Sequence, residues 1–207
     1  TEPSPANGTL YHAPVPVATT TTLRAAAFKE GFEPTNVDTQ SYLFLADVLR
    51  QPDSIPGYPD TWAGKPAHYH MDPEVVNHPL DGPRMLEALQ AFPSLSIAIN
   101  PGEMFGRAGI YQNPQSQGDS WERSVSAEFI SPDGSEPGFQ VNAGMRVQGG
   151  SSRNPDIPKH SLSLRFRRDY GPGKLDYPLF RDAPFGDSAV EEFDFLQLRA
   201  GFNFAWT

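Results

Sequence analysis

The stretch FQVNAGMRVQGGSSRNPDIPKHSLSLRF, residues 139–166, decides the fold of this chain. On either side of a loop rich in Gly, Ser and Pro, apolar and polar residues alternate with the period of two that is typical of a β-strand. The polar face of the first run holds Gln140, Asn142, Arg146 and Gln148. The polar face of the second run holds Lys159, Ser161, Ser163 and Arg165. We predict two paired strands, joined by residues 149–158, whose polar faces merge.

The same alternation recurs elsewhere and predicts an α+β fold. We expect one mixed, mostly antiparallel sheet formed by residues 94–100, 124–130, 139–148, 161–167 and 193–199. The last run is more continuously apolar, which is typical of a strand buried on both faces. Asp72 and Pro73 have the pattern of an N-cap and a first helical residue. A second helix between Pro83 and Pro93 is expected to pack an apolar stripe on the sheet, made of Met85, Leu86, Leu89 and Phe92.

Composition excludes several classes of protein. The 207 residues include no Cys, which rules out disulfides, thiolate metal sites and a Cys nucleophile. No apolar run reaches the ~18 residues of a membrane-spanning helix. No signal peptide is visible. A net charge of −9 opposes general binding to nucleic acid, because the phosphate backbone repels an acidic surface.

The charge is unevenly distributed along the chain. Residues 146–181 hold eight of the 16 basic residues but only three of the 25 acidic ones. Within this island we expect four cations to approach one another around the loop, namely Arg146, Arg153, Lys159 and Arg165. Gly149, Gly150, Ser151 and Ser152 can offer backbone N–H groups and hydroxyls to phosphate oxygens. The alternative is a solvent-facing hairpin whose arginines pair with Asp156, Asp169 and Asp176.

Histidine and serine suggest two weaker sites. His68 and His70 can share one face of an extended segment, near Asp72, Glu74 and His78. Their spacing matches no metal signature, so we favour surface or capping roles and predict no metal ligand among them. Ser151 and Ser152 lack the strand-to-helix elbow of a Ser hydrolase.

Several spaced motifs together resemble the N-terminal half of the bacterial spore-coat protein H (CotH) kinase-like family. They are GMRVQGGSSR at 144–153, PKHSLSLRF at 158–166, YPLF at 177–180 and FLQLRAGFN at 195–203. The resemblance covers residues 70–207. Gly150 stands where the family loop has Asn, and His160 where it has a second Lys.

The N-terminal residues carry a second resemblance. Residues 1–11 and 20–28 are similar to the end of a chitobiase/β-hexosaminidase C-terminal-like β-sandwich. We therefore expect a partial sandwich at 1–45 with few contacts to the sheet, a linker at 46–69 and a partial kinase-like domain at 70–207. Phe202, Phe204 and Trp206 are expected to be exposed apolar residues of this fragment.

The kinase resemblance implies an atypical protein kinase that binds ATP with Mg²⁺ or Mn²⁺ and phosphorylates Ser or Thr of a protein. It places Ser151, Ser152 and Arg153 near the phosphates and gives Lys159 the role of the ATP-contacting lysine. The expected convergence of cations adds Arg146 and Arg165 to these candidate ATP-binding residues. The catalytic and metal-binding acids of the family follow position 203, so we expect them beyond Thr207 and expect this chain alone to be inactive. The resemblances imply a secreted or cell-surface location, a protein substrate, and a glycan as a further candidate partner at the N-terminal module. The alternative is a non-enzymatic pseudokinase that serves in surface adhesion or glycan binding.

Overall fold

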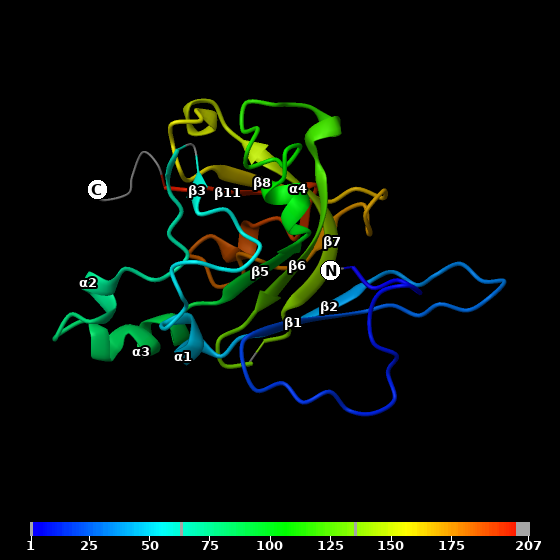
Figure 1. Cartoon of the computed structure of the whole chain (residues 1–207), viewed down its shortest axis with the longest axis horizontal. Coiled ribbons are helices and arrows are strands. Elements are labelled where there is room, and N and C mark those ends of the chain that lie inside the picture. Colours follow the sequence, from blue (N-terminus) through cyan, green and yellow to red (C-terminus); the bar gives the residue numbers. More distant parts are fainter. Residues whose placement is uncertain (1, 63, 135, 202–207) are drawn as a thin grey trace. The chain divides into compact units, whose positions relative to one another are not determined.

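The computed structural model describes residues 2–62, 64–134 and 136–201. Figure 1 shows short helices and strands connected by long loops. The helices are α1 (Leu45–Val48), α2 (Pro73–Val76), α3 (Met85–Gln90) and α4 (Pro101–Phe105), with 3₁₀ turns at Gly82–Arg84, Asp119–Trp121, Ser151–Arg153 and Gly186–Ser188. The strands are β1 (Thr21–Ala25), β2 (Asp38–Tyr42), β3 (Thr61–Trp62), β4 (Lys65–Pro66), β5 (Ser94–Ile99), β6 (Arg123–Ile130), β7 (Phe139–Gln148), β8 (Ser161–Arg165), β9 (Leu175–Asp176), β10 (Glu192–Phe193) and β11 (Phe195–Leu198). No helix in the described ranges is both long enough and apolar enough to cross a bilayer.

The predicted sheet is present. Five strands follow the order β11-β8-β7-β6-β5, and β8 pairs antiparallel with both β7 and β11. The fold is therefore α+β with mostly antiparallel strands, as the alternating runs predicted. Strand β11 stands at one end of this order, and its Phe195 is 51% exposed. The expectation of a strand buried on both faces was wrong, because exposed and half-buried residues alternate along β11 and one of its faces is open.

The chain divides into two compact units, each built from three stretches of sequence. Unit 1 consists of Thr1–Ile55, His68–Asn100 and Glu128–Gln140. Unit 2 consists of Pro56–Ala67, Pro101–Ala127 and Val141–Thr207. The module boundaries at 45 and 70 were drawn from resemblances and stay a prediction.

Unit 2 holds the apolar core. Its alternating strands bury Val141, Ala143, Met145 and Val147 from β7 together with Val125, Ala127 and Leu164 from β6 and β8. Leu164 lies opposite Met145 in the β7–β8 register, so the two apolar runs form one face. The opposite face of the same hairpin is polar, and it carries the candidate site.

Unit 1 is organised around a buried acid. The hairpin β1–β2 pairs Thr21 with Tyr42 and Ala25 with Asp38. The backbone N–H of Ser41 on β2 donates to Glu128 Oε2 of β6 at 2.6 Å, and Gln40 Nε2 donates to Glu128 Oε1 at 2.5 Å. The hairpin therefore contacts the sheet strand directly, and the expectation of few contacts was wrong.

The helices of unit 1 follow their sequence signals only in part. Asp72 caps α2 as predicted, because its carboxylate accepts a hydrogen bond from the Glu74 N–H at 2.9 Å and Pro73 opens the helix. Helix α3 begins after Pro83 as expected, but Leu86 and Phe92 are 38% and 71% exposed. The predicted burial of the whole stripe is therefore wrong. Phe202, Phe204 and Trp206 lie outside the described residues.

A candidate anion site on the polar face of β7 and β8

Three arginines gather on the polar face of the β7–β8 hairpin. In the antiparallel register, Arg146 lies opposite Ser163 and Gly144 lies opposite Arg165, so both arginines share one face. Arg167 lies two residues beyond Arg165. We call Arg146, Arg165 and Arg167 the arginine cluster.

Two carboxylates from the segment before β6 face the arginine cluster. Asp119 Oδ1 is 2.8 Å from Arg167 Nη2 and 3.4 Å from Arg146 Nη1. The Glu122 carboxylate is 3.3 Å from Arg167 Nε and 3.8 Å from Arg165 Nε. The five side chains together carry one net positive charge at neutral pH. The predicted neutralising acids Asp156, Asp169 and Asp176 were therefore the wrong ones.

The two acids differ in their access to solvent. The Asp119 side chain is 70% exposed, whereas that of Glu122 is 1% exposed. Glu122 fits beneath the arginines because β7 has a glycine there. A Cβ added to Gly144 would lie 2.3 Å from Glu122 Oε1 and 2.5 Å from Cε2 of Tyr170, so a larger residue would collide with both side chains.

Electrostatics within the site reflect crowding of like charges. Burial, and then the neighbouring Arg146, lower the pKa of Arg165. The hydrogen bond to Asp119 raises the pKa of Arg167, and the same bond lowers the pKa of Asp119. Burial and the charge of Glu122 raise the pKa of Tyr170. The ion pair between Arg167 and Asp119 thus favours the charged forms of both residues.

Arg165 is the least satisfied group of the cluster. Its side chain is only 22% exposed, yet it donates no hydrogen bond to any described residue. Its contacts are the distant ion pair with Glu122 and the ring of Phe195, whose centroid lies 5.4 Å from the guanidinium carbon. The hydroxyl of Ser163, on the same face, is also buried without a described partner. Shielded donors of this kind are rare in folded proteins and call for an acceptor.

The loop between the strands forms a compact turn. Ser152 donates its hydroxyl to the Gln148 carbonyl at 3.0 Å, and His160 Nδ1 donates to the Ser152 carbonyl at 2.6 Å. Gly149 has a φ of +113°, and a Cβ there would lie 2.2 Å from the Ser152 hydroxyl, so this position requires glycine. Ser151 is exposed. Burial lowers the pKa of His160, which is therefore a neutral imidazole at neutral pH.

Arg153 does not join the arginine cluster. Its Nε donates to the Pro114 carbonyl at 2.9 Å, and its Nη2 donates to the carbonyls of Gln115 and Ser116. The predicted convergence of four cations is therefore wrong, because backbone carbonyls of an irregular segment satisfy this guanidinium. Beside it lies an open cavity of about 370 Å³, lined by Gln115, Gln117, Gly149, Gly150, Arg153 and Asn154.

Lys159 also lies apart from the arginine cluster. It is exposed at the end of the loop and has no hydrogen bond or ion pair with any described residue. Of the six predicted site residues, the hairpin thus brings Arg146 and Arg165 together. Ser151, Ser152 and Arg153 form the neighbouring 3₁₀ turn.

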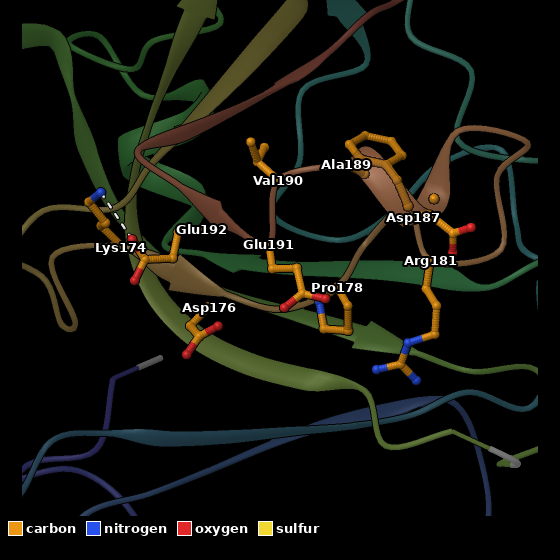
Figure 2. Close-up of a pocket in the computed structure, with 11 residues that line it drawn as sticks. Lys174, Asp176, Pro178, Arg181, Asp187, Ala189, Val190, Glu191 and Glu192 are labelled. Atoms are coloured by element: carbon orange, nitrogen blue, oxygen red, sulfur yellow. Dashed lines mark hydrogen bonds and ion pairs between the residues drawn. The ribbon is translucent and has the colours of Figure 1, made fainter.

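No significant match to this chain was found among protein-family models, curated proteins or solved structures. The assignment of a function therefore depends on the chemistry of the site. A second cavity of unit 2, of about 800 Å³, differs from the arginine cluster in its charge (Figure 2). Its lining includes Asp176, Asp187, Glu191 and Glu192 against two cations, Lys174 and Arg181, so its charge opposes a phosphate.

Sequence reasoning missed Arg167, Asp119, Glu122 and Tyr170. Arg167 had a usable signal, because it continues the alternation of Ser163 and Arg165 on one face. Asp119 and Glu122 had no such signal, since they lie in and just after a 3₁₀ turn that precedes β6. That turn is fixed by Arg123, which donates to the carbonyls of Ala108 and Ser120 at 2.9 Å.

Proposed function

We propose that the arginine cluster binds phosphate groups of ATP and that the chain is the nucleotide-binding half of a kinase-like protein. The observation that carries the proposal is Arg165, a shielded guanidinium without a hydrogen bond to any described residue. Phosphate oxygens are strong acceptors for guanidinium donors and form charge-assisted hydrogen bonds with them. The resemblance to the CotH kinase-like family supplies the identity of the ligand and the transfer to Ser or Thr of a protein.

The two acids have different roles in this proposal. Glu122 is buried beneath Arg165 and Arg167 and stays there as a fixed negative charge. Asp119 is exposed, so it can leave Arg146 and Arg167 when phosphate arrives. The metal that accompanies ATP neutralises part of the phosphate charge when bound. We assign no residue of this chain as its ligand.

Lys159 extends the proposed site toward the loop. It is exposed and unpaired among the described residues, and so it is available to a phosphate. His160 differs in this respect. Burial lowers its pKa, so it adds no positive charge at neutral pH where the family has a second lysine.

Calorimetric titration of the full-length protein with ATP and Mg²⁺ tests the proposal. We expect Arg165→Gln to weaken binding at least tenfold, because it removes a guanidinium from the centre of the cluster. Arg168→Gln is the matched control, since Arg168 is exposed and lies three residues away with the same charge. It should alter the affinity less than twofold. Equal losses in both variants would mean that general charge, and no built site, attracts the nucleotide.

A second variant examines the lysine. Lys159→Ala should weaken ATP binding while changing the free energy of unfolding by less than about 0.5 kcal/mol, as is usual for an exposed residue. Thermal melting of the same sample checks the fold. Wild-type affinity in Lys159→Ala would remove this residue from the site and leave the arginine cluster as the only candidate.

One observation favours the non-enzymatic alternative. Arg153, which the resemblance places near the phosphates, donates three hydrogen bonds to backbone carbonyls through Nε and Nη2 and thereby joins two segments of the chain. If the wild-type protein does not bind ATP, the same polar face is better explained as part of a surface adhesion or glycan-binding protein. A glycan-array experiment then becomes the next test.

A further inference from the structure

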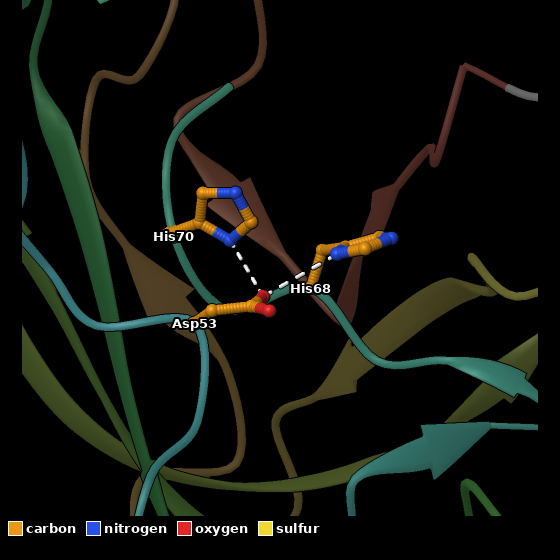
Figure 3. Close-up of side chains that lie close together, drawn as sticks. All are labelled: Asp53, His68 and His70. Carbon is orange, nitrogen blue, oxygen red and sulfur yellow. Dashed lines mark hydrogen bonds and ion pairs between the residues drawn. The ribbon is translucent and has the colours of Figure 1, made fainter. Parts of the chain in front are cut away.

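We propose that Asp53, His68 and His70 form a zinc site in unit 1. Figure 3 shows the two imidazole rings turned toward one carboxylate. Asp53 Oδ1 lies 3.3 Å from His68 Nδ1 and 2.6 Å from His70 Nδ1. One ligand atom from each residue lies within 4.8 Å of those of the other two. We call these residues the Asp–His–His triad.

The local backbone explains how two histidines meet one acid. His68 and His70 are two residues apart in the extended segment that follows β4, so their side chains leave it on the same side. Their rings pack edge to face with centroids 5.6 Å apart. A hydrogen bond of 2.5 Å from Gln51 Nε2 to the Tyr69 carbonyl joins the two segments that supply the triad. The triad is therefore held together without help from a metal.

The chemistry of the donors fits zinc. Two imidazole nitrogens and one carboxylate oxygen are a common set of three protein ligands, and the fourth position of the tetrahedron then takes water. With metal–ligand bonds of about 2.0–2.2 Å, neighbouring ligand atoms of a tetrahedral site lie about 3.4 Å apart. The separation of 3.3 Å between Asp53 and His68 matches this edge. His70 has only to move outward by a fraction of an ångström.

The position of His70 agrees with the assignment. Its Nδ1 is shielded from solvent and lies 2.6 Å from the Asp53 carboxylate, so the nitrogen and the oxygen already face each other. Solvent reaches the triad, because the side chains of Asp53 and His68 are 61% and 65% exposed.

The other polar residues of this region are engaged elsewhere. Asp72 caps α2 through the Glu74 N–H, and His78 Nδ1 pairs with Asp81 at 2.8 Å. The sequence had grouped these residues with His68 and His70 because they are close along the chain. The structure adds Asp53 instead, 15 residues before His68.

Titration of the intact chain with ZnCl₂ tests this inference, after dialysis against a chelator. We expect one equivalent of Zn²⁺ to bind and its affinity to fall at least tenfold in His70→Ala and in Asp53→Asn. The matched control is His78→Ala, which removes a histidine from a two-residue His–Asp pair and should leave the affinity unchanged. Co²⁺ provides a second readout, since a tetrahedral site gives it strong visible absorption.

The outcomes separate clearly. Binding that is absent, that exceeds one equivalent without saturating, or that weakens equally in His78→Ala would overturn the site. Because zinc that binds only the folded state raises the melting temperature, wild type should be stabilised by excess Zn²⁺ and Asp53→Asn should not. Asp53→Asn keeps the shape of the side chain, so it remains informative if His70→Ala fails to fold.

Discussion

The two units of this chain bury an acid in opposite ways. Every fully buried apolar side chain among the described residues belongs to unit 2, whereas the buried residues of unit 1 are Thr39, Ser41 and Glu128. In unit 1, neutral donors surround Glu128: the Ser41 N–H and the amide of Gln40. In unit 2, two guanidinium groups face Glu122 at 3.3 and 3.8 Å, without a hydrogen bond between them.

The difference separates an acid that is held by hydrogen bonds from an acid that lies among cations of the proposed site. Two short hydrogen bonds from neutral groups hold Glu128 in place, and the residue is buried, so it is shielded from a ligand. The cations around Glu122 outnumber the acids and retain unused donors. A buried ion pair by itself is weak evidence for a stabilising role. We therefore interpret the unused guanidinium donors around Glu122 as evidence for anion binding.

The largest effect is expected from Glu128→Ala. The substitution removes two hydrogen bonds to a carboxyl group, each worth about 1.5–3 kcal/mol, so the free energy of unfolding of unit 1 should fall by about 3–6 kcal/mol. Hydrogen exchange at the Ser41 amide reports this directly, because that N–H bonds to Glu128. Glu128→Gln keeps an acceptor and should lose about half as much. Undiminished protection of Ser41 in Glu128→Ala would contradict the structural role.

A smaller effect on stability is expected from Glu122→Gln. It loses ion pairs but no hydrogen bond, and removing a buried charge recovers desolvation energy, so we expect a loss of about 1–2 kcal/mol. Affinity for ATP and Mg²⁺ should rise, because one competing negative charge leaves the arginine cluster. Denaturant unfolding and calorimetry on the same variant measure both quantities. A larger loss than in Glu128→Ala, or weaker ATP binding, would reverse the comparison between the two acids.

The smallest effect concerns pH and His160 of unit 2. Burial lowers the pKa of His160 in the folded chain, so the unfolded chain binds more protons at pH values between the lowered pKa and about 6.5. Stability is therefore fully present above that window and decreases as pH falls through it. His160→Gln keeps a donor for the Ser152 carbonyl but cannot titrate. Urea unfolding across this pH range should show a flatter profile in the variant, and identical slopes would exclude His160 as the cause.

The alternation of residues predicted the sheet and half of the site. Because side-chain direction follows position along a strand, Arg146 and Arg165 were placed correctly on one face. The same rule says nothing about where long side chains end once a strand stops. Arg153 turns to carbonyls 37–39 residues earlier in the chain, and Glu122 reaches the cluster from just after a 3₁₀ turn. Contacts of this kind depend on tertiary packing, which local sequence does not encode.

The Asp–His–His triad could also be predicted only in part from the local sequence. The pairing of His68 with His70 is local and could be seen in the sequence. Asp53 could not be, because it lies in a loop whose path back to the histidines depends on the bond between Gln51 and Tyr69. Asp72 was grouped with the histidines because it is close to them along the chain, but its carboxylate caps α2 instead.

The interleaving of the two units has a consequence for the order in which the protein is made. Ser41 leaves the ribosome 87 residues before Glu128, the acceptor that its backbone N–H requires. At roughly 5–20 residues per second, the hairpin β1–β2 waits about 4–17 s for its partner. During that interval its strand edges are open to any other extended segment. The hairpin β1–β2 is thus synthesised well before the strand that secures it.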